Sequence, residues 1–354
     1  MRKNLSQKSI SRRNFGLLGL TAALTTGGIV AAPSAFAVGE GPGYGGNETI
    51  NTSILHTYDE LVAELKKQAA KQSNLELEVI GQSVKGRDIY LAKYMSNPAN
   101  PTILFLTQQH GNEQLTTEGA LEFIKHLGTG KTRDVLAGVN ILIVPMLNPD
   151  GAMGDVNFSL DNYIAKGRHL TRYNANEVDL NRDHVVKIQP ETQALHFNVM
   201  RKYKIDYMID LHHQGARSER DGELVSGSIL YPTTPNVSAT VLEGSKRLGA
   251  VVFPAIDPTG WGHLGRYVGG TAETISRNGI AVEYGISTLL FEMRGMSDHE
   301  YAPYVLGQKS NGYLIKQTVL TLTATTRAIA DGSINTADTS FWDTLAEQKS
   351  RSGE

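Results

Sequence analysis

The first regular pattern of apolar and polar residues along the chain, at residues 57–94, predicts a helix followed by a β-hairpin. Residues 57–70 alternate apolar and charged side chains at helical spacing. Residues 75–80 and 89–94 are strand-like runs, and the glycine-containing segment 81–87 between them is typical of a turn. These segments therefore predict one helix and one pair of adjacent strands.

Two compact apolar runs farther along the chain predict the centre of a sheet. Residues 102–106 and 140–146 have the length of strands, and residues 117–127 between them have the pattern of a helix. This order of strand, helix and strand favours a parallel sheet that is buried on both faces.

The second half of the chain adds further candidate elements. Residues 207–211 form another short apolar run, and residues 279–283 and 289–292 are also candidate strands. Residues 313–329 have the length and apolar spacing of a closing helix, whereas residues 331–354 predict a polar C-terminal tail. Together, these elements predict an α/β fold with a mixed, largely parallel central sheet flanked by helices on both faces.

The composition fits a single globular domain, which we place at residues 55–330. Of the 354 residues, 40% are hydrophobic and 20% are charged. The 34 basic and 36 acidic residues give a net charge of −2, so no electrostatic footprint for nucleic acid is visible. Because the chain has no cysteine, disulfides and thiolate ligands are excluded, and a metal would be held by His, Asp or Glu.

The N-terminus carries the pattern of an export signal. Arg12 and Arg13 precede an uncharged stretch at residues 16–32, and residues 35–37 read Ala-Phe-Ala, which fits a cleavage site. This pattern resembles a twin-arginine signal, with removal after Ala37. We therefore expect a periplasmic or extracellular protein without a membrane anchor after cleavage; the alternative is a basic tail before an anchor. Residues 38–54 read as a linker.

Polar residues stand just beyond three of the predicted strands. His110, Asn148 and His212 each follow one of the apolar runs described above. In open α/β sheets, ligands bind at the carboxyl ends of the strands. We therefore expect these side chains to meet at one edge of the sheet.

His110 and His212 belong to a candidate metal site. His110 and Glu113 can share one ion, but a His-x-x-Glu pair alone is weakly specific. Catalytic zinc needs a third protein ligand and an open position for water. His212 and His213 end the strand at 207–211, and alternation along a strand sends only one of them to the site. We select His212, and His213 reads as a surface or hydrogen-bonding histidine.

Five motifs occur in an order that resembles the zinc carboxypeptidases related to carboxypeptidase A. They are His-x-x-Glu at 110–113, Asn-Pro-Asp-Gly at 148–151, Asp-Leu-Asn-Arg at 179–182, Asp-Leu-His at 210–212 and Phe-Glu-x-Arg at 291–294. The turn at 81–87 also resembles a hairpin of that family. The resemblance spans about residues 55 to 325.

The resemblance implies a role for each residue around the metal. One zinc ion would be bound by His110, Glu113 and His212. Asp179 would orient a ligand imidazole from the outer shell. Glu292 would be the general base that takes a proton from the attacking water.

The resemblance also implies groups that contact the substrate. Asn181 and Arg182 would hold the terminal carboxylate, a task that suits the planar guanidinium. Arg172 would face the oxyanion, with Arg168 nearby as its rival. Tyr267, which precedes a glycine pair, would close over the substrate, and Tyr284 is the alternative.

The implied function is zinc-dependent hydrolysis of the C-terminal bond of peptides, with Glu292 as general base. One alternative is a zinc peptidase or amidase that acts on cell-wall peptides through the same residues. A second alternative is a non-catalytic binding module. The expected partner is a peptide, and no oligomeric state follows from the sequence.

Overall fold

The computed structural model describes residues 55–153, 172–215, 218–295 and 308–350. The predicted export signal and linker, residues 1–54, lie outside these ranges. No helix in the described ranges is both long enough and apolar enough to span a membrane.

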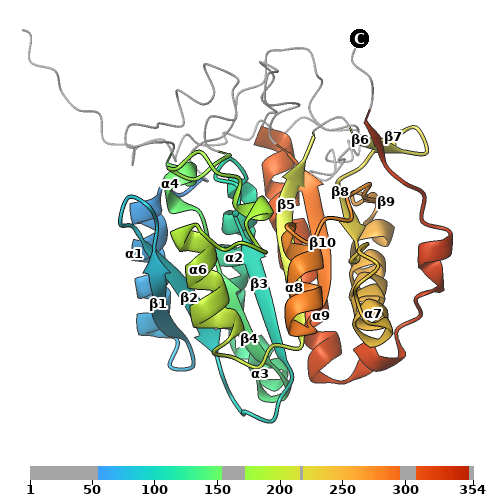
Figure 1. Cartoon of the computed structure of the whole chain (residues 1–354). Coiled ribbons are helices and arrows are strands. Elements are labelled where there is room, and N and C mark those ends of the chain that lie inside the picture. Colours follow the sequence, from blue (N-terminus) through green and yellow to red (C-terminus); the bar gives the residue numbers. More distant parts are fainter. Residues whose placement is uncertain (1–54, 154–171, 216–217, 296–307, 351–354) are drawn as a thin grey trace, which may run out of the picture. The chain divides into compact units, whose positions relative to one another are not determined.

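Eight strands form one mixed sheet within the described residues (Figure 1). In spatial order they are β1 (Glu76–Gln82), β2 (Asp88–Tyr94), β4 (Asn140–Val144), β3 (Thr102–Thr107), β5 (Tyr207–Gln214), β10 (Ser287–Arg294), β8 (Gly227–Leu230) and β9 (Leu264–Arg266). The central strands β4, β3, β5 and β10 run parallel, while β2 and β8 pair with them in antiparallel orientation. A small second sheet contains β6 (Ser218–Arg220), β7 (Glu223–Leu224) and β11 (Lys349–Ser350).

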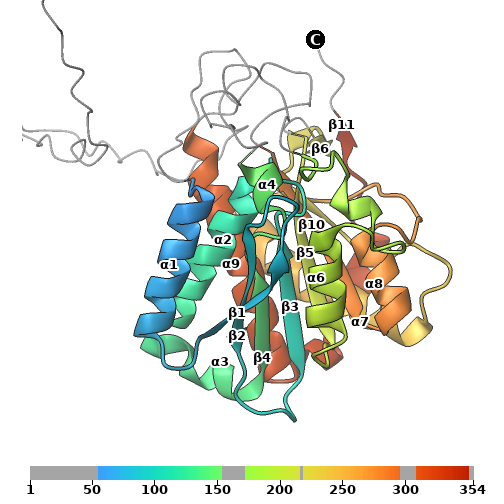
Figure 2. The same ribbon diagram turned by 60° about the vertical axis from the view of Figure 1, so that its left-hand side comes forward.

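Helices cover both faces of the main sheet, as Figures 1 and 2 show from two directions. One face carries α1 (Tyr58–Lys71), α2 (Gln114–Leu127), α3 (Arg133–Gly138), α7 (Ala239–Ile256) and α9 (Gln308–Ala330). The other face carries α6 (Pro190–Leu195), the short π-helix η4 (His196–Met200) and α8 (Ser276–Tyr284). The predicted α/β fold with a largely parallel sheet between two helical layers is confirmed.

The central strands alternate between two hydrophobic cores. In β3, Ile103 and Phe105 belong to the larger core beneath α2 and α9, whereas Leu104 and Leu106 belong to the smaller core beneath α6. Because both faces are covered, the strand reads in the sequence as a continuous apolar run.

The predicted hairpin and the helices at either end of the domain are present. Helix α1 begins at a capping box, in which the Glu60 backbone N–H donates to Thr57 Oγ1 at 3.3 Å and the Thr57 N–H donates to Glu60 Oε2 at 2.9 Å. Strands β1 and β2 pair antiparallel, and α9 contains the helix predicted at residues 313–329.

The strand predicted at residues 279–283 is wrong, because these residues lie in α8. A short apolar run fits a buried helix as well as a strand. Gly285, directly after the run, has a left-handed φ of 66° and follows the last residue of the helix. A glycine in this conformation is a frequent end of a helix, so the signal for α8 was present in the sequence.

The C-terminal segment also differs from the predicted polar tail. Residues 331–350 contain two short 3-10 turns, η6 (Ser333–Thr336) and η7 (Ser340–Asp343), and strand β11. Trp342 and Leu345 are only 3% and 6% exposed and belong to the larger core. A few apolar anchors are therefore enough to pack a segment whose average composition is polar.

This C-terminal segment is hydrogen-bonded to the edge of the main sheet. The Arg266 backbone N–H in β9 donates to the carbonyl of Ala346 at 2.9 Å, and the Gln348 N–H donates to the carbonyl of Arg266 at 2.8 Å. The indole N–H of Trp342 donates to the carbonyl of Lys246 in α7 at 2.9 Å. The segment thus joins β9 to the helical layer.

Candidate metal centre

Alternation along two neighbouring strands sends three acidic or imidazole side chains to one face of the sheet. Asp210 and His212 are two residues apart on β5, and Glu292 on β10 is the register partner of His212. Leu211, between Asp210 and His212, and Phe291, directly before Glu292, belong to the larger core on the opposite face. Asp210, His212 and Glu292 therefore lie on the face that carries α6 and α8.

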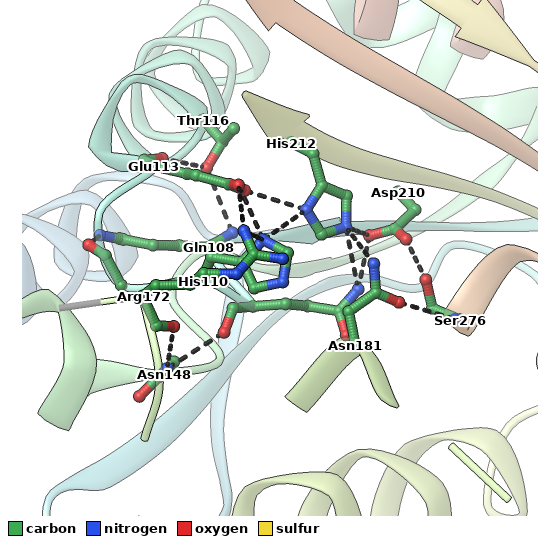
Figure 3. A network of polar contacts seen from close by, with 12 residues as sticks. Gln108, His110, Glu113, Thr116, Asn148, Arg172, Asn181, Asp210, His212 and Ser276 are labelled. Carbon is green, nitrogen blue, oxygen red and sulfur yellow. Dashed lines mark hydrogen bonds and ion pairs between the residues drawn. The ribbon is translucent and has the colours of Figure 1, made fainter. Parts of the chain in front are cut away.

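The turn that contains His110 and Glu113 connects β3 to α2. Gln108, directly after β3, has a left-handed φ of 52°, which is unfavourable for a residue with a Cβ atom. Its side-chain Nε2 donates to the carbonyl of Gly111 at 2.8 Å, and the Glu113 N–H donates to the carbonyl of His110 at 3.1 Å. The hydrogen bonds compensate the strained backbone and turn both ligand candidates toward the end of β5 (Figure 3).

His110, Glu113 and His212 bring their donor atoms to one point (Figure 3). Nδ1 of His110 lies 2.7 Å from Glu113 Oε1, Nδ1 of His212 lies 2.9 Å from Glu113 Oε2, and the two Nδ1 atoms are 3.2 Å apart. All three residues are buried. Two imidazoles and one carboxylate form a known ligand set of catalytic zinc, so this group can hold a metal ion.

The outer nitrogen of each imidazole contacts a carboxylate. Nε2 of His110 lies 3.0 Å from Asp179 Oδ1, and Nε2 of His212 lies 3.0 Å from Asp210 Oδ1. An ionised carboxylate only accepts hydrogen bonds, so Nε2 donates in both cases. The Nδ1 atom of each neutral ring then presents a lone pair to the shared point, which is the orientation that metal ligation requires.

Electrostatic interactions couple the ligand side chains. Burial favours a high pKa for Glu113, but His110 and His212 outweigh it and hold that pKa well below its ordinary value. Burial lowers the pKa of His212, yet Asp210 and Glu113 raise it well above its ordinary value. Because metal ligands bind in their deprotonated form, a proton and a metal ion compete for this group.

Glu292 lies next to His212 on the adjacent strand and is not one of the three candidate metal ligands. Its side chain is buried, and its Oε2 atom has no hydrogen-bond partner among the described residues. Burial raises the pKa of Glu292 to about 7, although His212 and His110 act in the opposite direction. A carboxyl group with a pKa near neutrality can both accept and return a proton at physiological pH.

Residues 61–218 match the sequence model of a family described as zinc carboxypeptidase. The matched range contains all three candidate ligands, His110, Glu113 and His212. This part of the chain is therefore similar to zinc carboxypeptidases. The resemblance drawn from the order of the motifs is confirmed over this range.

Curated carboxypeptidases match over part of their length. The zinc carboxypeptidase of Saccharothrix mutabilis subsp. capreolus is 34% identical over 111 residues, which are 28% of this chain and 26% of that protein. The carboxypeptidase N catalytic chain of Mus musculus is 32% identical over 145 residues, which are 36% of this chain and 30% of that protein. The match thus spans less than a third of either relative.

Solved structures of carboxypeptidases share the fold. The metallo-carboxypeptidase from Burkholderia cenocepacia superimposes with a TM-score of 0.58 and 18% sequence identity, over 79% of this chain and 70% of that chain. At this level of identity the likeness extends to the architecture, and the roles of individual residues rest on the geometry of the site.

Arg172, the residue expected to face the oxyanion, lies next to the candidate metal ligands. Its Nη2 donates to Asp179 Oδ2 at 3.0 Å, while Nη1 lies 3.2 Å from Nδ1 of His110 and 3.9 Å from Glu113 Oε1. Asp179 therefore connects Arg172 with the first imidazole. The rival Arg168 lies outside the described residues.

Asn181 and Arg182 occupy the 3-10 turn η3 (Leu180–Arg182). Asn181 is buried; its Oδ1 accepts a hydrogen bond from the Ser276 N–H at 2.8 Å, and its Nδ2 lies 3.4 Å from Nε2 of His212. Arg182 is exposed, and its Nη1 donates to the carbonyl of Asn181 at 2.7 Å. Asn181 thus packs behind the second imidazole, while Arg182 presents a cation at the surface beside it.

The two candidate tyrosines have different surroundings. Tyr267 directly follows β9, and its backbone N–H donates to the carbonyl of Ile229 at 3.0 Å; the charge of Glu292, followed by burial, raises the pKa of Tyr267. The Tyr284 hydroxyl instead lies 2.9 Å from Nδ1 of His196, beneath the helical layer, and burial raises its pKa to about 12.

The sequence reasoning missed the groups that hold Asp210 behind the second ligand. Gln109 Nε2 donates to Asp210 Oδ1 at 2.7 Å, and the Ser276 hydroxyl donates to Asp210 Oδ2. The spacing of Asp210 and His212 on one strand was a usable signal, because residues two apart share a face. Gln109 and Ser276 offered no such signal, since their positions depend on the folded loops.

The Asn-Pro-Asp-Gly motif has a structural part in this site. The Asp150 carboxylate is buried and accepts hydrogen bonds from Ser83 Oγ at 2.9 Å and from Arg87 Nη1 at 2.5 Å. Asn148 Nδ2 donates to the carbonyl of Gln109 at 3.1 Å. The motif therefore ties the turn of the first hairpin to the loop that carries the ligands.

Proposed function

We propose that the chain is a metallocarboxypeptidase that uses one zinc ion to remove the C-terminal residue of peptides. The main support is that Nδ1 of His110, the carboxylate of Glu113 and Nδ1 of His212 meet at one point. Glu292, the strand neighbour of His212, has an Oε2 atom without a hydrogen-bond partner among the described residues. The match of residues 61–218 to the zinc carboxypeptidase model supports peptide hydrolysis as the reaction. The carboxyl terminus of a peptide is the chemical feature that distinguishes this substrate class.

The residues around the ligands can carry out the remaining chemistry. A bound zinc ion would act as a Lewis acid and lower the pKa of a water molecule. Glu292 would take the proton of the attacking water and deliver it to the leaving amine, and its raised pKa suits both transfers. The Arg172 guanidinium, beside the ligand group, would stabilise the negative charge that develops on the carbonyl oxygen.

The cation of Arg182, next to the site, would direct hydrolysis to the last peptide bond. Arg182 would bind the α-carboxylate of the substrate, and Asn181 holds that guanidinium through its backbone carbonyl. Tyr267 would cover the bound residue from the side of Glu292. A peptide without a free α-carboxylate would lose the contact with Arg182 and be a poor substrate.

Mass spectrometry of peptide products tests the proposal. We expect zinc-supplied protein to release single residues from the C-terminus, a chelator to abolish the release, and added zinc to restore it. The same peptide with an amidated C-terminus is the matched control and should be hydrolysed slowly. Internal cleavage, or hydrolysis that resists chelation, would contradict the proposal. Faster hydrolysis of a cell-wall stem peptide than of ordinary peptides would favour the amidase alternative.

We also propose that the protein is exported through its twin-arginine signal and cleaved after Ala37. The support is the sequence pattern around Arg12 and Arg13, because residues 1–54 lie outside the described residues. N-terminal sequencing of the exported protein should find Val38 first. Replacement of both arginines by lysine should leave the precursor uncleaved, and an unchanged mature N-terminus would contradict this route.

A further inference from the structure

Arg277, the second residue of α8, is a buried cation that forms no ion pair with any acidic residue in the described part of the chain. Its side chain is only 2% exposed. The recorded hydrogen bonds run from Nη2 to the carbonyl of Gly270 at 2.6 Å and to Thr233 Oγ1 at 3.2 Å. Both acceptors are neutral, and no carboxylate of the described residues forms an ion pair with this guanidinium. Its Nε–H is buried and has no hydrogen-bond partner among the residues that the structure describes.

The position of Arg277 is fixed relative to the candidate metal centre. The preceding residue, Ser276, donates its N–H to Asn181 Oδ1 at 2.8 Å and its hydroxyl to Asp210, so α8 starts directly behind the second imidazole. The guanidinium interacts electrostatically with Glu292 and Tyr267. Because α8 packs on the face of the sheet to which Glu292 points, Arg277 lies in the helix that covers the proposed general base.

The glycine pair after Tyr267 leaves room for this guanidinium. A Cβ atom on Gly269 would lie 2.7 Å from Nη2 of Arg277, so a larger residue would collide with it. The neighbouring Gly270 supplies the carbonyl that accepts a hydrogen bond from the same Nη2 atom. The loop thus packs onto one end of the guanidinium.

Arg277 is not needed to hold this loop, because Asn278 already does so. The Asn278 side chain donates to the carbonyls of Gly270 and Ala272 at 3.1 and 3.0 Å and accepts from the Thr233 N–H at 2.9 Å. A purely structural arginine at this place would have a costly charge and an unused donor, since buried cations are normally paired. The unused donor indicates a missing anionic ligand.

The acidic residue nearest in sequence does not supply this anion. Glu273 Oε1 accepts hydrogen bonds from Asn236 Nδ2 at 2.6 Å and from Thr234 Oγ1 at 3.1 Å. The Glu273 carboxylate is therefore bound by neutral groups of another loop. Among the described residues, no carboxylate is thus paired with Arg277, and a bound molecule can supply the anion.

We propose that Arg277 binds the side-chain carboxylate of the C-terminal residue, so that the protein prefers peptides that end in glutamate or aspartate. This inference rests on the proposed carboxypeptidase function. The exposed Arg182 remains assigned to the α-carboxylate, and the two arginines separate the two anionic groups of such a residue. A planar guanidinium can meet a carboxylate with two parallel hydrogen bonds, which favours arginine for this contact.

A panel of peptides that differ only in the last residue tests the inference. With zinc-supplied protein, we expect kcat/KM to be about 100-fold higher for a C-terminal glutamate than for the isosteric glutamine, because the buried guanidinium stays unpaired with glutamine. Lysine at this position should be the poorest substrate. A glutamate to glutamine ratio near one, with both peptides hydrolysed, would overturn the role of Arg277 alone. No hydrolysis of any peptide would instead overturn the proposed carboxypeptidase function.

Variants of the arginine supply the second arm of the test. Arg277→Met should bring the glutamate to glutamine ratio close to one, and Arg277→Lys should retain part of the preference because it keeps the charge. Arg247→Met is the matched control, since that arginine on α7 pairs with Glu243 at 3.2 Å, and the ratio should stay at the wild-type value. An equal loss for both peptides in folded Arg277→Met would contradict the inference. If that variant does not fold, the wild-type panel and Arg277→Lys decide.

Discussion

Glu292 and His212 are register partners on the adjacent parallel strands β10 and β5. Both side chains point to the face that carries α8, whereas the neighbouring Leu211, Phe291 and Met293 pack into the larger core. The proposed base and the proposed metal ligand are therefore held by one rigid part of the sheet. The other two ligands come from the loop after β3, which the unusual backbone at Gln108 directs toward the same place.

Glu292→Gln should remove hydrolysis while leaving metal binding intact. The substitution keeps the shape of the side chain but removes the group that accepts a proton, so we expect kcat to fall by about 10²- to 10⁴-fold. Zinc content, measured by elemental analysis, should stay at one ion per chain because Glu292 is not a ligand. Glu122→Gln, in an exposed ion pair on α2, is the control. Unchanged turnover in Glu292→Gln would exclude this residue as the base.

The pH dependence of kcat/KM should report the environment of Glu292. The ionised carboxylate is the active form, so activity should fall tenfold for each pH unit below its pKa. Burial raises this pKa from 4.5 to about 7, whereas a bound metal cation favours the ionised form. We therefore expect an acidic limb with a pKa above 4.5 and no higher than about 7. An acidic limb below the ordinary value would show that another group sets it.

Asp210→Asn should weaken metal binding through the second imidazole. The carboxylate accepts the Nε2–H of His212 at 3.0 Å and keeps the lone pair of Nδ1 directed at the centre. Loss of such an outer contact typically lowers metal affinity by about 10- to 100-fold. Competition with a chromogenic zinc chelator measures this change, and Asp59→Asn on the exposed side of α1 is the control. Equal affinity in both variants would contradict the assigned role of Asp210.

Trp342→Ala should destabilise the whole domain. The indole is 3% exposed in the larger core, and its N–H is bonded to α7, so its removal leaves a cavity and an unpaired carbonyl. We expect the free energy of unfolding to fall by about 3 to 5 kcal/mol. The midpoint of urea unfolding measures this change. Phe197→Ala, at a position that is 41% exposed, should change the midpoint little, and equal effects would exclude a core role for Trp342.

The central sheet could be predicted because its strands have a simple sequence pattern. β3 and β4 are buried on both faces and read as continuous apolar runs. Alternation along β5 predicted that only one of His212 and His213 points to the site, and the structure places the selected His212 with the other candidate ligands. These features depend on local periodicity, which a single sequence contains.

Features that depend on tertiary contacts could not be read in the same way. The run at 279–283 has too few residues for periodicity to separate a strand from a helix, and Gly285 was the local signal for the end of α8. The importance of Arg277 follows from its burial and from the lack of an acidic partner in the described ranges, and neither property is visible in the sequence. The anchoring of residues 331–350 likewise rests on Trp342 and Leu345 among polar neighbours.

The packing of the C-terminal segment has a consequence for self-association. β9 is the last strand of the main sheet, and an uncovered edge strand is a template onto which a second molecule can add a strand. The backbone of Arg266 in β9 is instead bonded to Ala346 and Gln348 of its own chain. Residues 346–348 therefore occupy backbone groups that a second molecule would otherwise use to pair with β9. Loss of their anchor at Trp342 should lower solubility as well as stability.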